Sequence, residues 1–535
     1  MFGLKFNERS TPKSTHPMAD ATAAARLVGE LPLDMPGSAV AEAAAWLESI
    51  EAEAFAASHR LHLTSMIDEA VNASVEELTL AYLGAAAGNQ GQASDWRVLM
   101  GYLDRLGAVY AAIAEDSAAL RNPEFAACMP LVLVRAIRAI TRSMKISWLR
   151  YLPPDRASWE ALVRCYRTSR GRGSAKTMVL AYAEDSEQTC GLHELTVGVM
   201  LAAAAPQSLT PRQVEISYRI AAAHRGLFTV NAGHEQHWRH YLFNLDDASP
   251  PARLPDQVVA GGDLLFFSAE AVLPQLQPIV ERSTSGVAMM ADAQFGLEFG
   301  AIEKLSALEH VLKFWDDSPP SRRDERVRIN TKIQVEVGGA AIRKALEQGT
   351  EPENAETPSL SMLELAGDSA PAAPANPVAP LNNWILTDFS TRGIGARFSR
   401  RLDRWLRVGS LVGFKLERSE KWCVAIVRRL RTDARNQTDV GCEILAKSAR
   451  LVKLEGMASA GTLLDLAGSG PIVRTEAVML PDDGLHARAS LLFEPGTNAP
   501  GQSFVLHDGD NARRIRLCTV AESMDGWDRV EFDVL

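Results

Sequence analysis

The stretch VRINTKIQVEV, residues 327–337, marks a change in the hydrophobic pattern of the chain. Its apolar positions, Val327, Ile329, Ile333, Val335 and Val337, alternate with polar or charged ones. Successive side chains of a β-strand point to opposite faces, so a period of two predicts a strand with one buried face. A β-domain is therefore expected to begin close to this stretch.

The residues upstream show a helical pattern instead. From about residue 20 the chain is rich in Ala and Leu at the 3.6-residue spacing of helices. A helix start is visible where Thr210 precedes Pro211, because Thr caps helices and Pro fits the first helical position, and YLPPDRASWEAL is a break of the same kind. We predict an all-α scaffold or interaction array over residues 19–317, preceded by a disordered tail at residues 1–18.

Short strands with alternating apolar positions follow downstream. They are predicted around residues 394–398, 412–416, 422–426 and 440–444. Short antiparallel strands joined by turns favour a closed barrel, which has no exposed sheet edge. The predicted fold class is multidomain α + β, with the helical array, a six-stranded antiparallel β-barrel over residues 318–450 and a small C-terminal β-domain over residues 451–535.

A long insert interrupts the barrel at residues 339–381. Residues 339–348 are compatible with a short helix, but residues 351–380 contain five acidic residues, no basic one and many Pro and Ala. That composition is typical of a flexible, exposed segment. Each doubling of loop length costs only about 0.6 kcal/mol in closure entropy, so the insert is compatible with a folded barrel.

Charge and cysteine content limit the function classes. The 535 residues carry a formal net charge of −10, which disfavours whole-chain attraction to nucleic acid or anionic lipid, although 15 Lys and Arg outnumber 7 Asp and Glu between Trp384 and Arg450. The six cysteines form no CxxC pair and fit neither a disulfide framework nor a zinc ribbon. With no leader-like apolar start and no apolar run long enough for a bilayer, we expect a cytoplasmic protein without membrane insertion.

A polar hairpin in the barrel region carries the first motif. In TDFSTRGIGARF, residues 387–398, the pattern D-x-S-x-x-G places Asp388 and Ser390 on the same side of an extended backbone. Gly393 is expected to permit a positive-φ turn. The alternative is a hairpin whose polar side chains only cap their own backbone.

The second motif lies directly ahead of the first strand. The segment SRRDER supplies Arg322-x-x-x-Arg326. The alternative is an exposed charged run without a ligand, in which Arg323 and Arg328 offer competing pairs.

Together the two motifs resemble those of the PilZ domain, the bacterial receptor module for cyclic di-GMP, over residues 320–450. The Gly409-Ser-Leu-Val stretch, WCVAIVRR at residues 422–429 and Val440-Gly441 are similar to that family as well. More loosely, a helical N-terminal half followed by an interrupted barrel and a β-rich tail is similar to the layout of long PilZ proteins from some proteobacteria.

The resemblance implies a ligand and its site. Cyclic di-GMP is a dianion with two guanines, and by the family's pattern Arg322 and Arg326 clamp its phosphates or guanine edges with their guanidinium forks. Asp388 would accept hydrogen bonds from guanine N1–H and N2–H₂, Ser390 would add a polar contact, and Gly393 would let the backbone approach closely. No other cofactor is implied.

The expected function is that of a non-enzymatic receptor. It would couple cyclic di-GMP to a protein partner of the helical half, with motility, pili, biofilm or surface behaviour as the output, and ligand capture between the two halves would reorient them. Two alternatives stay open: an assembly scaffold with a degenerate barrel, and a nucleic-acid-binding barrel. The second is disfavoured because the aromatic residues of the region lie on apolar faces: Trp384, Phe398, Phe414 and Trp422.

Other chemistry has little support. No GxxxxGK[ST], GxSxG or strand-linked GxGxxG is present, which argues against nucleotide hydrolysis, esterase chemistry and dinucleotide redox. His234, His237 and His240 lie three residues apart, whereas zinc proteases place two histidines four residues apart with Glu between. A surface or interdomain helix is favoured there, and no metal site is predicted.

Overall fold

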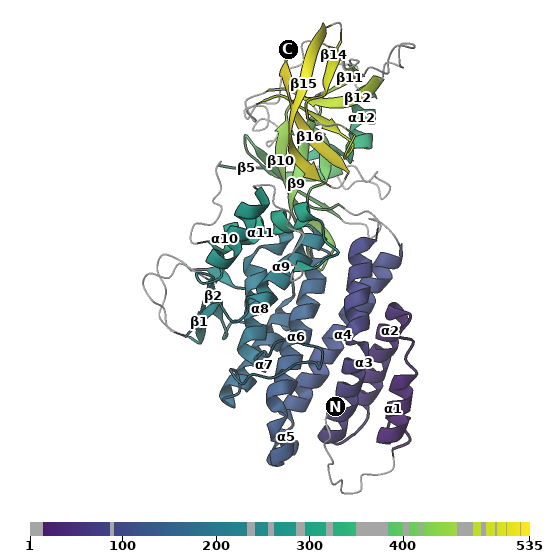
Figure 1. Cartoon of the computed structure of the whole chain (residues 1–535), viewed down its shortest axis with the longest axis vertical. Coiled ribbons are helices and arrows are strands. Elements are labelled where there is room, and N and C mark those ends of the chain that lie inside the picture. Colours follow the sequence, from purple (N-terminus) through teal and green to yellow (C-terminus); the bar gives the residue numbers. More distant parts are fainter. Residues whose placement is uncertain are drawn as a thin grey trace. The chain divides into compact units, whose positions relative to one another are not determined.

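The computed structural model describes residues 14–85, 90–232, 241–254, 262–284, 295–316, 325–348, 383–399, 406–416, 419, 421–456, 474–482, 488–497, 500–509, 511–524 and 526–535. The chain divides into two compact units, Met1–Pro320 and Ser321–Leu535. The first unit is mainly helical and the second consists of two β-barrels and a short helix (Figure 1).

The helices of the first unit are α1 (Ala21–Gly29), α2 (Pro36–Ala52), α3 (Ala57–Gly84), α4 (Gln90–Glu115), α5 (Pro123–Ala127), α6 (Met129–Trp148), α7 (Arg156–Gly171), α8 (Gly191–Ala203), α9 (Pro211–Ala223), α10 (Leu273–Thr284) and α11 (Ala301–Trp315). The predicted helix start at Thr210 is confirmed, because its side chain and that of Gln213 form a reciprocal capping box. In YLPPDRASWEAL, Asp155 caps α7 by accepting from the backbone N–H of Ser158.

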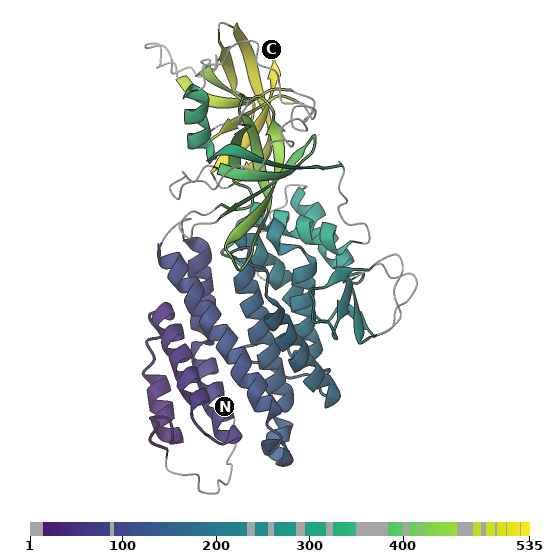
Figure 2. The same cartoon turned by 180° about the vertical axis from the view of Figure 1, so that it is seen from behind.

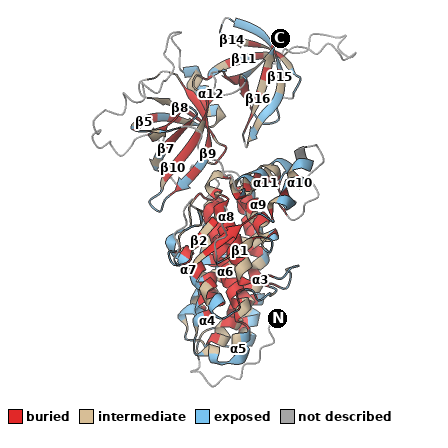
Figure 3. Ribbon diagram, turned by 90° about the vertical axis from the view of Figure 1, so that its left-hand side faces the viewer, coloured by how far each residue is buried: buried red, intermediate tan, exposed pale blue. Residues whose placement is uncertain are grey.

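Helix α6 forms the centre of this unit. It packs against α4, α7, α8 and α9, and Figure 3 shows buried residues concentrated around α6 and α8. Buried residues occupy all sides of α6, as expected for a helix enclosed by others. Within the described ranges, no helix has both the length and the apolar composition needed to cross a membrane.

A row of four cations runs along α6 at spacings of three or four residues, which places them on one face. Their side chains are at most 12% exposed, and each has a carboxylate partner: Arg135 with Asp68 and Glu69, Arg138 with Asp185 and Glu194, Arg142 with Glu76, and Lys145 with Glu215. Buried charges persist only when they are paired. The row therefore ties α3, α8 and α9 to the central helix.

The prediction of an all-α N-terminal region is wrong in one part. A four-stranded sheet of order β1-β4-β2-β3 lies between α9 and α10, with strands β1 (Thr229–Asn231), β2 (Tyr241–Asn244), β3 (Ala252–Arg253) and β4 (Leu264–Ser268). Its longest strand, LLFFS, is a continuous apolar run, and such a run does not distinguish a buried strand from a buried helix. The hydroxyl of Tyr241 donates to the Ala203 carbonyl at 3.1 Å and ties the sheet to α8.

The first barrel of the second unit is closed, six-stranded and antiparallel, as predicted. Its strand order is β10-β7-β6-β5-β8-β9, with β5 (Val327–Val337), β6 (Asn383–Phe389), β7 (Gly393–Ser399), β8 (Leu411–Leu416), β9 (Cys423–Thr432) and β10 (Gln437–Ala446). In β5 the alternation holds at Ile329, Ile333 and Val335, which are buried, but Val337 at the strand end is 46% exposed.

The C-terminal β-domain is a second closed six-stranded barrel of order β11-β12-β13-β16-β15-β14. Its strands are β11 (Arg450–Gly456), β12 (Arg474–Leu480), β13 (Ser490–Phe493), β14 (Ser503–Asp508), β15 (Asn511–Met524) and β16 (Trp527–Val534). Residues 339–348 form helix α12 (Gly339–Gln348), the short helix compatible with the start of the predicted insert. Residues 349–381 of the insert lie outside the described ranges.

The two barrels share an apolar core to which α12 contributes, and Figure 2 shows this teal helix beside the barrels. Its buried residues are Ile342, Leu411, Val424, Ile426, Leu445, Ala446, Ala449, Val478, Leu480, Leu492 and Trp527. Trp527 is 3% exposed and donates from Nε1 to the carbonyl of Gly409 at 2.9 Å. Arg428 of β9 also pairs with Glu522 of β15 at 2.6 Å.

Replacing Trp527 by Phe tests this junction. The variant keeps an aromatic ring but leaves the buried carbonyl of Gly409 without its donor, so we expect the free energy of unfolding of the barrels to fall by about 1–2 kcal/mol. Urea denaturation measures this loss. The control is Trp46→Phe, because Trp46 donates to Glu42 at an exposed site and its loss should change stability by less than about 0.5 kcal/mol. Equal losses in the two variants would contradict a stabilising role for the Trp527 bond.

Candidate functional site

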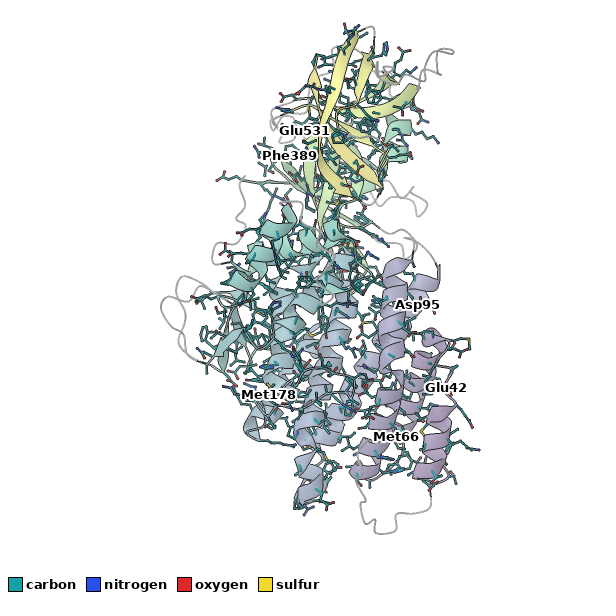
Figure 4. The ribbon with its side chains drawn as sticks, viewed as in Figure 1. Glu42, Met66, Asp95, Met178, Phe389 and Glu531 are labelled. Carbon is teal, nitrogen blue, oxygen red and sulfur yellow. The ribbon has the colours of Figure 1, made fainter. Side chains whose placement is uncertain are left out.

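Strands β5, β6 and β7 bring the two sequence motifs together. β6 pairs with both neighbours, with Val327 opposite Phe389 and Arg328 opposite Asp388 in β5, and Asp388 opposite Gly395 in β7. Figure 4 labels Phe389, the last residue of β6 and the neighbour of Asp388. The insert does not separate the motifs, because the chain returns at Asn383 directly alongside β5.

An ion pair joins Arg326, the residue before β5, to Asp388 in β6. Nη1 of the arginine contacts Oδ1 of the carboxylate, and the two side chains are 29% and 27% exposed. A pair as open to water as this one contributes little to stability, about 0–1 kcal/mol. Its members can therefore change partners at small cost. Arg322, the first arginine of the motif, lies outside the described residues.

Ser390 holds the turn between β6 and β7. Its backbone N–H donates to the carbonyl of Gly393 at 2.8 Å, and its hydroxyl donates to the same oxygen at 3.3 Å. The residue is 4% exposed. Ser390 thus caps its own backbone, as expected for a hairpin whose polar side chains make only local contacts. Asp388 instead contacts Arg326, a residue of another segment.

Gly393 is needed for space rather than for a positive φ. It is not among the glycines with a left-handed backbone, so the expected positive-φ turn is wrong. A Cβ at this position would lie 3.0 Å from the carbonyl oxygen of Cys442 and 3.5 Å from Nη2 of Arg326. The glycine lets β10 and the arginine approach the hairpin closely.

Gly395 is a site residue that the motif analysis did not identify. The Asp388 carboxylate lies directly over it: a Cβ there would be 2.8 Å from Oδ1 and closer still to Oδ2. The orientation of Asp388 toward Arg326 therefore depends on the missing side chain of its cross-strand neighbour. In the sequence, Gly395 is marked only as the second glycine of GIG, and this pattern does not indicate a role until the strand register places Gly395 opposite Asp388.

We expect Gly395→Ala to weaken ligand binding at this site by roughly tenfold, because the new methyl group must displace the Asp388 carboxylate, and tenfold corresponds to about 1.4 kcal/mol. Isothermal titration with the ligand proposed below measures this change. Gly339→Ala is the matched control, since nothing lies within 4 Å of a Cβ there. If both variants bind like the wild type, the position of Asp388 does not depend on Gly395.

Cys442 lies behind the hairpin, inside the barrel. Burial raises the pKa of its thiol to about 12, although the positive charge of Arg326 acts in the opposite direction. The thiol is therefore protonated at neutral pH and takes no part in nucleophilic chemistry. All six cysteines of the chain are free.

The aromatic residues Trp384, Phe398, Phe414 and Trp422, all within the described part of the first barrel, do not form an exposed stacking surface. Trp384, Phe414 and Trp422 are at most 5% exposed. Phe398, which is partly exposed, stacks on Trp384 with ring centres 4.6 Å apart. This arrangement does not favour the nucleic-acid alternative.

No metal site is predicted from the sequence, and the structure describes only some of the residues concerned. His234, His237 and His240 lie outside the described ranges. Among the residues that are described, no group of three or more His, Cys, Asp or Glu is arranged to hold a metal ion.

A polar cavity of about 220 Å³ lies within the helical unit. Arg138, Arg142, Arg225, Glu194 and Tyr218 are among its lining residues. Its arginines already hold carboxylate partners, since Arg138 pairs with Glu194, Arg142 with Glu76, and Arg225 with Glu187. The cavity is part of the charged core and does not by itself indicate a ligand.

The first barrel and its two motifs define a PilZ-type domain attached to a helical unit. Family models support this assignment on both parts: residues 22–235 match the N-terminal domain of the cyclic-di-GMP receptor FimW, and residues 344–450 match its middle PilZ domain. The chain therefore belongs to the FimW family of cyclic-di-GMP receptors. No individually curated protein matches it.

The matched regions include one of the two motifs. The PilZ match contains Asp388, Ser390 and Gly393 but begins after β5, so Arg322 and Arg326 lie outside it. The second barrel also lies outside both matches.

Proposed function

We propose that Arg326 and Asp388, with Arg322, Ser390 and Gly393, form the cyclic di-GMP site of this receptor. The observation that carries the proposal is the ion pair between Arg326 and Asp388, which joins the two motifs across β5 and β6. Two charged groups of opposite sign at one exposed point suit a ligand that has both anionic phosphates and hydrogen-bond donors.

Binding exchanges the partners of this pair. The phosphates of cyclic di-GMP take up the guanidinium of Arg326 and, by the family's pattern, that of Arg322. Asp388 then accepts from N1–H and N2–H₂ of a guanine, a geometry in which one carboxylate serves two parallel donors. Ser390 keeps the turn closed and offers its oxygen as an acceptor, and Gly393 leaves the approach open.

The direct test is isothermal titration of cyclic di-GMP into the full chain, with GTP as the control nucleotide. The proposal requires saturable binding of cyclic di-GMP and a much weaker interaction with GTP. The absence of binding would favour the alternative of an assembly scaffold with a degenerate barrel.

We further propose that the protein acts without catalysis, by coupling the ligand to a partner of the helical unit. Arg326 lies only a few residues after Pro320, the last residue of the first unit. An effector shifts such an arrangement only through its different affinity for the two states. Small-angle scattering with and without saturating ligand tests this coupling, which an unchanged shape and association state would contradict.

The cytoplasmic location remains a prediction. It is consistent with six free cysteines, five of them buried, since exported proteins commonly pair theirs.

A further inference from the structure

One row of residues crosses five adjacent strands of the first barrel. Its members, in register from strand to strand, are Arg328 in β5, Asp388 in β6, Gly395 in β7, Gly441 in β10 and Arg429 in β9. Residues opposite one another in a sheet point to the same face. The residues beside the row are buried, at Ile394, Ala396, Val440, Cys442 and Leu430, so the row itself faces outward.

The centre of this row has no side chains. Gly395 and Gly441 are direct neighbours in β7 and β10, about 4.8 Å apart as adjacent strands are. The next outward position on the same two strands carries the paired side chains of Arg397 and Asp439, 2.7 Å apart. The two glycines therefore form a local floor of backbone, which we call the glycine floor, and both glycines are buried under neighbouring side chains.

Two opposite charges flank the glycine floor. The Asp388 carboxylate lies over Gly395, as described above, and Arg429 lies over Gly441: a Cβ at Gly441 would be 3.6 Å from Cβ and 3.8 Å from Nε of Arg429. Arg429 is exposed. A carboxylate and a guanidinium thus cover the two ends of the floor, and both must turn aside for a ligand to lie on it.

We propose that Arg429 is a further ligand-contacting residue and that one guanine of cyclic di-GMP lies on the glycine floor between Asp388 and Arg429. This inference rests on the proposed function and deepens it. Asp388 accepts from the N1–H and N2–H₂ edge of the base, and Arg429 donates to O6 and N7 on the other edge.

This arrangement selects guanine over adenine at both ends. Adenine presents an acceptor, N1, where Asp388 also accepts, and a donor, the N6 amino group, where Arg429 also donates. Two acceptors, or two donors, cannot form a hydrogen bond with each other, and each such mismatch leaves a charged side chain without a hydrogen-bond partner on the base. Arg429 is therefore a specificity residue of the site.

The experiment compares cyclic di-GMP with its 7-deazaguanine analogue, which lacks N7, in titrations of the full chain. The wild type should bind the analogue about tenfold more weakly, as expected for loss of one base-edge contact. Arg429→Ala should bind cyclic di-GMP about tenfold more weakly and show no further loss with the analogue. The control is Arg431→Ala, an exposed arginine on the same strand that lies in register with Asp439 and should leave both affinities unchanged.

A second variant, Gly441→Ala, tests the floor itself. The nearest atom to the new methyl group is 3.6 Å away, an ordinary van der Waals contact, so circular dichroism should show an unchanged fold while the affinity for cyclic di-GMP falls. Unchanged affinity would contradict a base lying on the floor.

The outcomes separate this inference from the proposed function. If the wild type does not bind cyclic di-GMP, the proposed function itself fails. If it binds and Arg429→Ala binds equally well, only the role of Arg429 is overturned. If Arg429→Ala binds weakly but the analogue still loses affinity in that variant, Arg429 contacts a phosphate and the reading of the base is overturned.

Discussion

Replacing Asp388 by Ala is expected to weaken cyclic di-GMP binding by about 100-fold, since loss of a bidentate contact to a base edge costs about 1–3 kcal/mol. The two guanine donors lose their acceptor, and Arg326 loses the partner that positions it just before β5. Asp388→Asn should lose nearly as much, because the amide has the same shape but offers only one acceptor oxygen and carries no charge. Isothermal titration on the full chain gives both affinities.

The control for this prediction is Asp439→Ala. Asp439 is an aspartate in the same barrel, 48% exposed and paired with Arg397, and its loss should change the affinity by less than twofold. Arg326→Ala should also weaken binding, and the double variant with Asp388→Ala should lose less than the sum of the two single losses, because the two side chains contact each other. Equal affinities in Asp388→Ala and Asp439→Ala would refute the assignment of Asp388.

The second large effect concerns the folding of the helical unit. Arg138 donates to both oxygens of Glu194, at 2.9 and 3.1 Å, and to Asp185 at 2.8 Å. Arg138 is 12% exposed and Glu194 is 4% exposed. Arg138→Ala should lower the free energy of unfolding by about 3–5 kcal/mol, because the carboxylate of Glu194 is left buried without its countercharge.

Chemical denaturation followed by circular dichroism measures this loss. Arg156→Ala is the control, because Arg156 and Glu160 form an exposed pair, 76% and 51% exposed, and such pairs contribute little to stability. Replacing Arg138 and Glu194 together by Met should cost less than Arg138→Ala alone, since the buried carboxylate of Glu194 is removed with its countercharge and only the more exposed Asp185 loses this partner. Equal stability of Arg138→Ala and Arg156→Ala would contradict the stabilising role of the charged row.

The same variant should change the pH dependence of stability. Burial favours the neutral acid and would raise the pKa of Glu194, but Arg138 and the hydroxyl of Thr189 lower it, and the net pKa lies below the ordinary glutamate value. In the wild type, Glu194 therefore stabilises the fold at pH values above the ordinary glutamate pKa. This contribution is lost as the pH falls through the lower pKa that Glu194 has in the folded state. Without Arg138, burial prevails and the pKa rises, so the difference in stability between variant and wild type should shrink on acidification.

Local patterns in the sequence predicted the barrel well. The period of two at residues 327–337 arises from one buried strand face, and neighbouring strands repeat it at Ile394, Val412 and Val424, all buried. The motif residues Arg326 and Asp388 were also expected at one site, and they are in contact. These features depend on short-range spacing, which a single chain displays directly.

Features that depend on strand register or long-range pairing were not predictable in this way. Gly395, Gly441 and Arg429 form one row only because β7, β10 and β9 pair as they do, and a shift of one residue would turn them to the other face. The partner of Arg138, Glu194, lies 56 residues along the chain. The small sheet of the helical unit was missed because its strands are too short to show an alternation.

A crystal structure of the full chain with cyclic di-GMP bound would show directly whether Arg326 and Asp388 hold the ligand. We expect one guanine with N1 and N2 within about 2.7–3.2 Å of the Asp388 carboxylate and a phosphate bound by Arg326 in place of Asp388. A ligand bound elsewhere on the chain, with the ion pair of Arg326 and Asp388 intact, would contradict it.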